Sequence, residues 1–478
     1  MKLKLTIGIM FLQINLLAFS GCQSLDLPSK TVNNETPANY GVTNEPSTSD
    51  IPNPINWESY FDDPNLSLLI HEALSNNQEL NMVLQDIIID QNEIRARKGE
   101  YLPSVSFHAG AGFDKAARYT PQGAVEHHLE VRPGVHFPEP VPDFMFGAYA
   151  SWEVDVWKKL RNAKKAALTR YLATVEGKNF LITNIVAEIA ESYYELIALD
   201  NMLEIINSNV QIQSNVFQVI QQQKEAAKVT QLAVNRFEAQ VLNTMNLQFE
   251  VRQKIVETEN KINFLVGRFP QPIERNSSKF LTYDTAEIES GLPSDLLEHR
   301  PDIRQANLQL AASKLDVKVA KANFYPSFGI QSGIGFQAFN PSFLINPASL
   351  LYGLAGDLMA PLVNRNAIKA VYYNANAKQI QAIYDYERTI LQAYVDVVNQ
   401  LNKVENYNKS FDIKSKEVAL LNKSTAISNN LFNAARADYM EVLLTQREAL
   451  EANMELLEIK LHQLHAKVSL YRALGGGV

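Results

Sequence analysis

The sequence predicts a mainly α-helical chain with a membrane β part: a long α-helical coiled-coil barrel plus a β-barrel that closes only by trimerisation. Three observations support this fold class. Proline is absent between Pro142 and Pro270 and again after Pro361, which favours long helices in both stretches. Strand-like alternation is confined to two shorter regions that precede these stretches. The two halves of the chain also match each other, so we expect four strands per chain in two tandem repeats.

Composition excludes several other classes of protein. The chain has 478 residues, 44 Lys and Arg against 52 Asp and Glu, and one cysteine. A single thiol forms no internal disulfide and no cysteine-rich metal site. The formal net charge is −8, and no basic block or stripe stands out, which argues against a nucleic-acid partner. A mean hydropathy of −0.16 argues against a helical membrane protein.

The N-terminus has the layout of a secretory signal peptide, predicted over residues 1–21. Two lysines precede an apolar run over residues 5–19, and small residues then lead into Cys22. This segment resembles the lipobox of bacterial lipoproteins, whose cysteine is lipidated, and an ordinary signal peptide with an incidental cysteine is the alternative. Gln23 stands where Asp favours inner-membrane retention in lipoproteins, so we expect outer-membrane sorting.

Residues 22–56 are predicted to form a lipid-anchored tether. They are rich in Pro, Asn, Ser and Thr and hold too few apolar residues to pack. Beyond this segment, the most apolar window, residues 180–199, contains three glutamates, which are costly at a bilayer centre. Membrane-spanning helices are therefore not expected.

The first repeat is predicted over residues 57–266 and contains a helical region, a strand hairpin and long helices. Apolar and small or polar residues alternate over residues 104–113 and 144–153, with about the ten residues that a tilted strand needs to cross a bilayer. Apolar side chains on one face and small polar ones on the other suit lipid outside and water inside. A soluble hairpin packed on a core would alternate in the same way. Two hairpins placed identically in two repeats of a lipid-anchored chain favour the membrane.

A connector over residues 267–294 leads to the second repeat, residues 295–478. Arg365-Asn366-Ala367 repeats Arg161-Asn162-Ala163, and alternation recurs over residues 327–337 and, more weakly, 350–358. Four strands cannot close a barrel, because the smallest transmembrane barrels have about eight and an open edge leaves backbone groups unpaired in lipid. Three copies would supply about 12 strands. We therefore expect a homotrimer.

Each proline-free stretch must turn back on itself. About 110 residues would make a single helix of about 165 Å. The turns are expected at residues 224–230 and 433–438, where Ala435 follows Ala227 by 208 positions. Apolar residues at spacings of four and three along both stretches predict coiled-coil seams.

Several segments resemble the outer membrane factor family, the TolC-type channel-tunnels of efflux and type I secretion, and in particular its lipoprotein (NodT-like) branch. The segments are Leu-Pro-Ser-Asp-Leu-Leu-Glu-His-Arg-Pro-Asp-Ile at 292–303, Val-Ala-Lys-Ala-Asn-Phe-Tyr-Pro-Ser at 319–327, and residues 152–155, 438–443 and 470–477. The resemblance covers nearly everything from residue 57 onward. It departs at Ala227 and Ala435, where the family often has glycine at the helical turns.

The resemblance implies a lipid-anchored outer-membrane channel with a periplasmic tunnel. Such a channel is the passive exit duct of a tripartite efflux system that exports drugs, toxic compounds or metal ions. Its partners would be two further copies of itself, outer-membrane lipid, a periplasmic adaptor (membrane fusion) protein and an inner-membrane transporter of the RND type. A type I protein secretion duct is the alternative within the family. A lipid-anchored periplasmic coiled-coil scaffold and an enzyme are the alternatives from other classes.

The helix turns hold the candidate functional residues. In the family, aspartates with nearby Arg and Tyr at the tip resemble a gate, which implies a periplasmic gate of Asp438, Arg436 and Tyr439. Threefold symmetry would make one carboxylate a ring of three. The alternative is that Asp438 caps the last helix. The matching tip of Lys224, Glu225, Ala227, Lys228 and Ala435 is expected to contact the adaptor, or to be a solvated turn.

No catalytic pattern is found, and neither a metal site nor a cofactor is predicted. The chain lacks a His-Glu-x-x-His sequence, a phosphate-binding loop and a Gly-x-Ser-x-Gly elbow. His462 and His465 share a helix face but are expected to flank a coiled-coil seam. The histidines and glutamates between the first two strands are interpreted as a solvated surface loop, with weak metal sampling as the alternative; they are His127, His128, His136, Glu126, Glu130 and Glu139.

Overall fold

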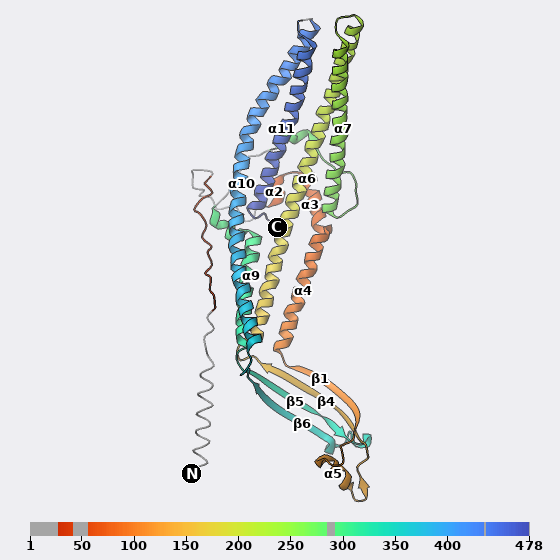
Figure 1. Cartoon of the computed structure of the whole chain (residues 1–478), viewed down its shortest axis with the longest axis vertical. Coiled ribbons are helices and arrows are strands. Elements are labelled where there is room, and N and C mark those ends of the chain that lie inside the picture. The colour runs from red at the N-terminus through yellow and green to blue at the C-terminus, as the bar shows by residue number, and fades with distance from the viewer. Residues whose placement is uncertain (1–26, 42–55, 284–291, 435, 478) are drawn as a thin grey trace. The chain divides into compact units, whose positions relative to one another are not determined.

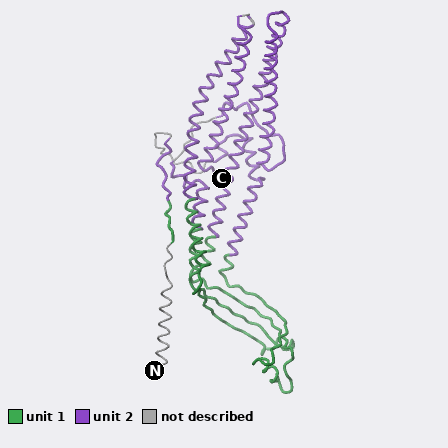
Figure 2. Tube along the Cα trace, in the orientation of Figure 1, with its two compact units in different colours: residues 1–32, 97–166, 313–384 green, residues 33–96, 167–312, 385–478 purple. Residues whose placement is uncertain are grey.

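The computed structural model of the chain describes residues 27–41, 56–283, 292–434 and 436–477. The predicted signal peptide, Cys22 and Ala435 lie outside these residues. The chain divides into two compact units (Figure 2). Unit 1 combines residues 97–166 and 313–384 with the chain up to residue 32, and unit 2 combines residues 33–96, 167–312 and 385–478. Each unit is therefore assembled from both predicted repeats.

Unit 1 is built on one antiparallel sheet of four strands (Figure 1). The strand order is β1 (Ser104–Asp114), β4 (Val141–Val154), β5 (Ser327–Ala338) and β6 (Leu350–Met359). The prediction of four strands, two from each repeat, is confirmed. The first hairpin of the sheet is joined through β5 to the second, so the two repeats pair along β4 and β5.

The register gives the sheet two faces of opposite character. Phe107 lies opposite Ala148, which lies opposite Ile334, which in turn lies opposite Tyr352. One position along, Ser106, Tyr149, Gly333 and Gly353 form the corresponding row on the other face. The first face is almost wholly apolar and the second is small or polar. In the single chain Phe107 is 73% and Tyr352 81% exposed, so this apolar face has no cover within the described part of the chain.

The connection between β1 and β4 has structure that the sequence pattern did not reveal. It contains α5 (Pro121–His128), β2 (Glu130–Arg132) and β3 (Val135–His136). Pro121 opens α5, and the Thr120 hydroxyl accepts a hydrogen bond from the Gly123 N–H at 3.2 Å. The β5–β6 connection holds two short 3-10 helices, η3 (Pro341–Phe343) and η4 (Pro347–Ser349).

At the opposite end of the sheet from α5, the strands continue directly into helices (Figure 1). They are the end of α4 (Gln78–Tyr101), the start of α6 (Lys159–Glu225), the end of α9 (Pro301–Ala322) and the start of α10 (Asn366–Asn433). The start of α6 is fixed by Asp155, whose carboxylate accepts hydrogen bonds from the N–H groups of Leu160 and Arg161. Burial raises the pKa of Asp155, but these bonds and the Arg161 guanidinium lower it by more.

Unit 2 is helical. It holds the remaining lengths of these four helices together with α2 (Trp57–Phe61), α3 (Pro64–Asn76), α7 (Gln231–Val266), α8 (Leu296–His299), α11 (Tyr439–Ala473) and the 3-10 helices η1 (Ser277–Thr282) and η2 (Pro293–Asp295). Figure 1 shows α6 turning back into α7 and α10 into α11. Both reversals that the sequence predicted are confirmed. The core of the unit is formed by fully buried side chains from several helices, including Leu66, Ile70, Ile189, Tyr193, Leu196 and Tyr471.

The N-terminal segment departs from the expectation that it packs nowhere. Tyr40 is buried, its ring stacks on Tyr394 with centroids 5.6 Å apart, and its hydroxyl donates to the Leu292 C=O at 3.5 Å. The pKa of the Tyr40 hydroxyl is raised well above its usual range, and burial is the main cause of this shift. One aromatic residue thus anchors a polar segment on unit 2. Among the described residues, no helix has the length and apolar character needed to cross a membrane.

Candidate functional site at the helix turns

The two helix turns of unit 2 share a backbone hydrogen bond at matching positions. The N–H of Lys228 donates to the C=O of Gln223 at 2.8 Å, and the N–H of Arg436 donates to the C=O of Leu431 at 2.8 Å. Each bond spans five residues, as in the Schellman motif that ends many helices. Donor and acceptor in the second turn both lie 208 positions after those in the first. The repeats therefore preserve the turn as well as the helices.

Ala227 holds a backbone conformation that glycine adopts more readily. Its φ is +58°, in the left-handed region, and its N–H donates to the C=O of Lys224 at 2.9 Å. A Cβ in this region costs about 1 kcal/mol. Alanine in place of the glycine that the family often has here therefore makes the turn both strained and stiffer.

We expect Ala227→Gly to stabilise this turn by about 1 kcal/mol, because glycine adopts a positive φ without the clash of Cβ. Hydrogen–deuterium exchange of peptides covering residues 216–237 should then slow by about fivefold. The matched control is Ala226→Gly, at the neighbouring residue, which has no positive φ and donates its N–H to Gln222. That change should accelerate exchange instead. Equal effects of the two substitutions would refute the account of strain.

An apolar cluster beneath the turns joins the two helical hairpins. Ile220, Ala233, Val234 and Phe237 from the first hairpin pack with Phe432 and Val442 from the second. Phe237 is 1% exposed. The ring of Tyr439 lies 6.5 Å from that of Phe237, and Arg236 Nη1 lies 3.4 Å from the sulfur of Met440. The structure therefore places predicted gate residue Tyr439 against the first hairpin.

Phe237 and Phe432 are not among the functional residues predicted from the sequence. Their signal was present in the pattern, since Ala233 and Phe237 share a helix face at a spacing of four. That pattern predicts an apolar, buried stripe along the helix but does not show which helices pack against it. Only the folded chain shows that the stripe of α7 meets the end of α10 and the start of α11.

Asp438 stands immediately before α11 in extended conformation, with φ −80° and ψ 152°. Its backbone C=O accepts the N–H of Glu441 at 3.1 Å, but its carboxylate makes no capping hydrogen bond. The alternative that this carboxylate caps the helix is therefore wrong for this structure. Asp438 and Arg436 are both exposed, and within the described residues neither side chain joins an ion pair. The carboxylate of Asp438 is therefore exposed to solvent in the single chain.

The predicted adaptor-contact residues lie together at the other turn. Lys224, Glu225, Ala227 and Lys228 are all exposed at the end of α6 and in the turn that follows. No ion pair connects these side chains to one another in the part of the chain that the structure describes. They form a small, solvated surface of mixed charge, and the cluster around Phe237 fixes it beside the turn that carries Asp438.

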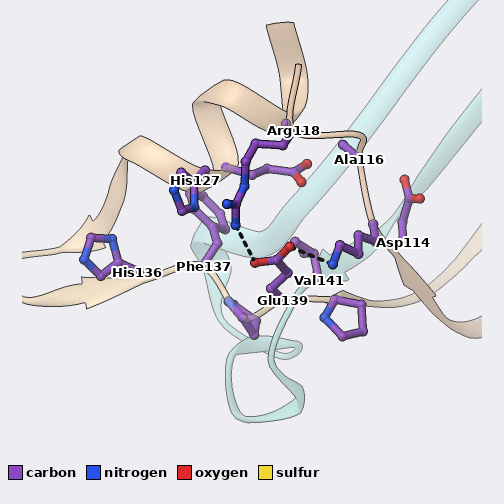
Figure 3. A pocket seen from close by; sticks show the side chains of 13 residues that line it. Asp114, Ala116, Arg118, His127, His136, Phe137, Glu139 and Val141 are labelled. Carbon is purple, nitrogen blue, oxygen red and sulfur yellow. Dashed lines mark ion pairs between the residues drawn. The ribbon is translucent and has the colours of Figure 1, made fainter. Parts of the chain in front are cut away.

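Apart from the helix turns, a concave region lies in the β1–β4 connection (Figure 3). It is a cavity of about 390 Å³ in which Glu139 accepts from Lys115 at 2.8 Å and lies 3.7 Å from Arg118. The hydrogen bond from Lys115 is the main influence that lowers the pKa of Glu139. His127 and His136 also line the cavity. Across the described residues, no group of three or more His, Cys, Asp or Glu side chains is arranged to hold a metal ion, so the metal-sampling alternative gains no support.

The two histidines of α11 contact neighbouring helices. His465 is largely buried, and its Nε2 lies 3.0 Å from the C=O of Glu191 on α6. Burial lowers the pKa of His465 and favours the neutral ring. His462 stacks on Tyr407 of α10 with centroids 5.2 Å apart. Both rings therefore serve helix packing.

Comparison with known proteins agrees with this architecture. A family model described as outer membrane efflux protein matches residues 69–268 and 292–476. The pyoverdine export outer membrane protein OpmQ of Pseudomonas aeruginosa is 26% identical over 422 residues, which cover 88% of this chain and 87% of that protein. The cation efflux system protein CusC of Escherichia coli is 23% identical over 421 residues, 88% of each chain. A crystal structure of CusC superposes with a TM-score of 0.82 at 21% identity, covering 94% of this chain and 99% of that one, which shows the same fold.

Proposed function

Because this chain belongs to the outer membrane efflux protein family, we propose that it is the passive exit duct of a tripartite system that exports small molecules. Membership makes the chain an outer membrane efflux channel and not an enzyme. The observation that carries the proposal is the two-faced sheet, since an uncovered apolar face suits lipid and a small polar face suits a water-filled lumen.

The duct is a homotrimer. β1 and β6 are the edges of the four-stranded sheet and have no outer neighbour among the described residues. Unpaired backbone groups are costly in lipid, so these edges call for further strands. Three copies would close a barrel of about 12 strands with room for a lumen. For each copy we propose the plan that the sequence predicts: a tether, residues 22–56, two repeats, residues 57–266 and 295–478, and a connector, residues 267–294.

The pump, rather than this chain, selects the cargo. The relatives are named for pyoverdine export and for cation efflux, two chemically different cargoes carried by proteins of one fold. An inner-membrane transporter of the RND type would supply energy. A periplasmic adaptor would join it to the exposed residues Lys224, Glu225, Ala227 and Lys228, with Ala435 as the matching position of the second repeat. The similarity of this chain to exporters of small molecules and ions favours a role in efflux over a role in protein secretion.

Deleting the gene tests this function. The deletion strain should become more sensitive to some members of a panel of drugs, bile salts and metal ions, and the gene in trans should restore resistance. Purified protein should conduct ions in planar bilayers as a trimer. A folded trimer without conductance would instead support the periplasmic scaffold. Purified protein that hydrolyses a substrate would support an enzyme.

We assign the periplasmic gate to Asp438, Arg436 and Tyr439. The uncapped, exposed carboxylate of Asp438 supports this assignment, because threefold symmetry would make it a ring of three negative charges. The three carboxylates would attract cations, and salt bridges between Asp438 and Arg436 of different copies would hold the tip narrow.

Asp438→Ala should raise single-channel conductance and drug leakage and reduce selectivity for cations, because the ring of carboxylates is lost. Planar-bilayer recordings measure the conductance and the cation selectivity, and uptake of an antibiotic that the intact outer membrane excludes measures leakage. Glu441→Ala, three residues further on, changes the net charge equally and is the matched control. Unchanged conductance in Asp438→Ala would count against the gate.

Lipid anchoring through Cys22 is a further part of the proposal. Cys22→Ser should abolish incorporation of labelled acyl chains and weaken membrane anchoring, while the strands still form a trimeric barrel. Acyl labelling and the trimer content of the outer-membrane fraction measure the two effects separately. An acyl label that persists in Cys22→Ser would exclude this residue as the anchor.

A further inference from the structure

Basic residues gather at one end of the sheet in unit 1. The segments that continue the strands on the helical side are residues 97–103, 155–166, 313–326 and 360–370. Together they contain 12 Lys and Arg against 3 Asp and Glu, in a chain whose net charge is −8. At the other end, residues 114–143 contain three Lys and Arg against five Asp and Glu. The sheet therefore separates a strongly cationic end from a weakly anionic one.

Much of this positive charge is not neutralised within the chain. Some of the cations have carboxylate partners, as Lys159 has in Glu153 and Arg161 in Asp155. Six others are exposed, and no ion pair connects them to a carboxylate among the described residues. They are Lys314 and five lysines that lie closer to the strands along the chain. We call these five the basic collar; they are Lys98, Lys158, Lys318, Lys321 and Lys369.

The basic collar begins where the apolar face of the sheet ends. Trp152 lies on that face, opposite Ile330, near the helical end of the sheet, and its Nε1 donates to the C=O of Tyr101 at 3.1 Å. An amphipathic indole in this position is typical of the membrane–water boundary. Just beyond β6, Leu362 and Val363 are largely exposed. The apolar surface of the sheet thus extends to the residues where the basic collar begins.

The spacing of the cations suits a headgroup layer. Lys158 follows the end of β4 by four residues, and Lys98 and Lys321 precede β1 and β5 by six. These short separations place the three lysines just beyond the strand ends, on the side where the hydrocarbon layer would give way to the polar region of the bilayer. Lys314, Lys318 and Lys321 also share one exposed face of α9, at a spacing of four and three. Long lysine side chains extend readily toward such a layer.

We propose that the basic collar binds the anionic phosphate headgroups of phospholipids, such as phosphatidylglycerol, in the leaflet on the helical side of the sheet. The cations are spread along four chain segments rather than directed into one cavity. The five are absent from the lining of the cavity of about 310 Å³ at this end, so a planar array of headgroups matches them better than one soluble anion. The placement in the periplasmic leaflet rests on the proposed function.

Lipid preference tests the proposal directly. The full-length trimer is placed in proteoliposomes with trace spin-labelled phosphatidylglycerol or phosphatidylcholine, and the motionally restricted fraction of each label is measured. The unaltered protein should prefer phosphatidylglycerol by about threefold or more at low salt, and the preference should weaken in 0.5 M salt. Combined replacement of the basic collar by glutamine, K98Q/K158Q/K318Q/K321Q/K369Q, should bring the ratio close to one.

A matched variant controls for the loss of charge. K254Q/K261Q/K403Q/K416Q/K423Q removes five exposed lysines of α7 and α10 within unit 2, and it should leave the lipid preference unchanged. If both labels associate equally with an unaltered trimer that conducts, the proposed lipid binding by the basic collar is wrong and the channel function stands. If the quintuple change shifts the reversal potential without altering lipid preference, the lysines face the lumen and the proposal is wrong. Absence of conductance in the unaltered trimer would instead refute the proposed function.

Discussion

Ile334→Arg should largely abolish assembly of the trimer in the outer membrane. Ile334 lies on the apolar face within the row formed with Phe107, Ala148 and Tyr352. A guanidinium on the lipid face of a barrel costs about 2–4 kcal/mol near the bilayer midplane, and a homotrimer carries this cost three times. The fraction of protein recovered as trimer from outer membranes measures the effect, with drug resistance as the functional result.

The other face of the same strand supplies the control. Gln331 lies on the small, polar face, opposite Ser151 and Ala355. Gln331→Arg should therefore assemble almost normally and change only conductance or ion selectivity. If Gln331→Arg blocks assembly while Ile334→Arg does not, the two faces have been assigned in reverse.

Phe237→Ala should release the two helix turns from each other. The ring is almost fully buried between the hairpins, and truncating a buried phenylalanine costs about 3–5 kcal/mol. Hydrogen exchange should accelerate by about a hundredfold or more in peptides covering residues 216–237 and 431–443, because both sides of the cluster lose their packing. Leakage of the channel should rise as well, since Tyr439, which we propose as a gate residue, packs against this cluster.

Phe249→Ala is the matched control for this substitution. Phe249 is on the same helix, α7, but is 66% exposed in the single chain and lies away from the turn. Its truncation should leave exchange of the tip peptides unchanged. If Phe237→Ala accelerates exchange only in the first hairpin, the cluster does not couple the two turns.

Much of the fold could be read from local patterns in the sequence. The alternation over residues 104–113 and the length of the proline-free stretches are properties of neighbouring residues. Strand and helix formation depends on the same neighbours, so both could be predicted. The positions of both turns followed from the matching repeats. For the same reason the candidate gate residues were found as a group, since Arg436, Asp438 and Tyr439 are adjacent along the chain.

Contacts between distant segments were not predictable in this way. Asn77 separates α3 from α4, and it does so because its buried side chain donates to the C=O of Leu265 at 2.8 Å and accepts from the N–H of Leu80 at 2.9 Å. Tyr40 is buried for a similar reason, as its ring finds Tyr394 some 350 residues later. Each local sequence allowed several structures, and the tertiary partner selected one.

The sequence by itself determined where strands, helices and reversals occur and that one chain holds only part of a barrel. The tertiary structure decided which faces meet: the pairing of β4 with β5, the packing of Phe237 against Phe432, and the exposed carboxylate of Asp438. It also decided the charge pattern of the surface. The lysines of the basic collar are scattered along some 270 residues and form no basic block in the sequence. Antiparallel pairing brings them to one end of the sheet, because it returns alternate strand ends to the same edge.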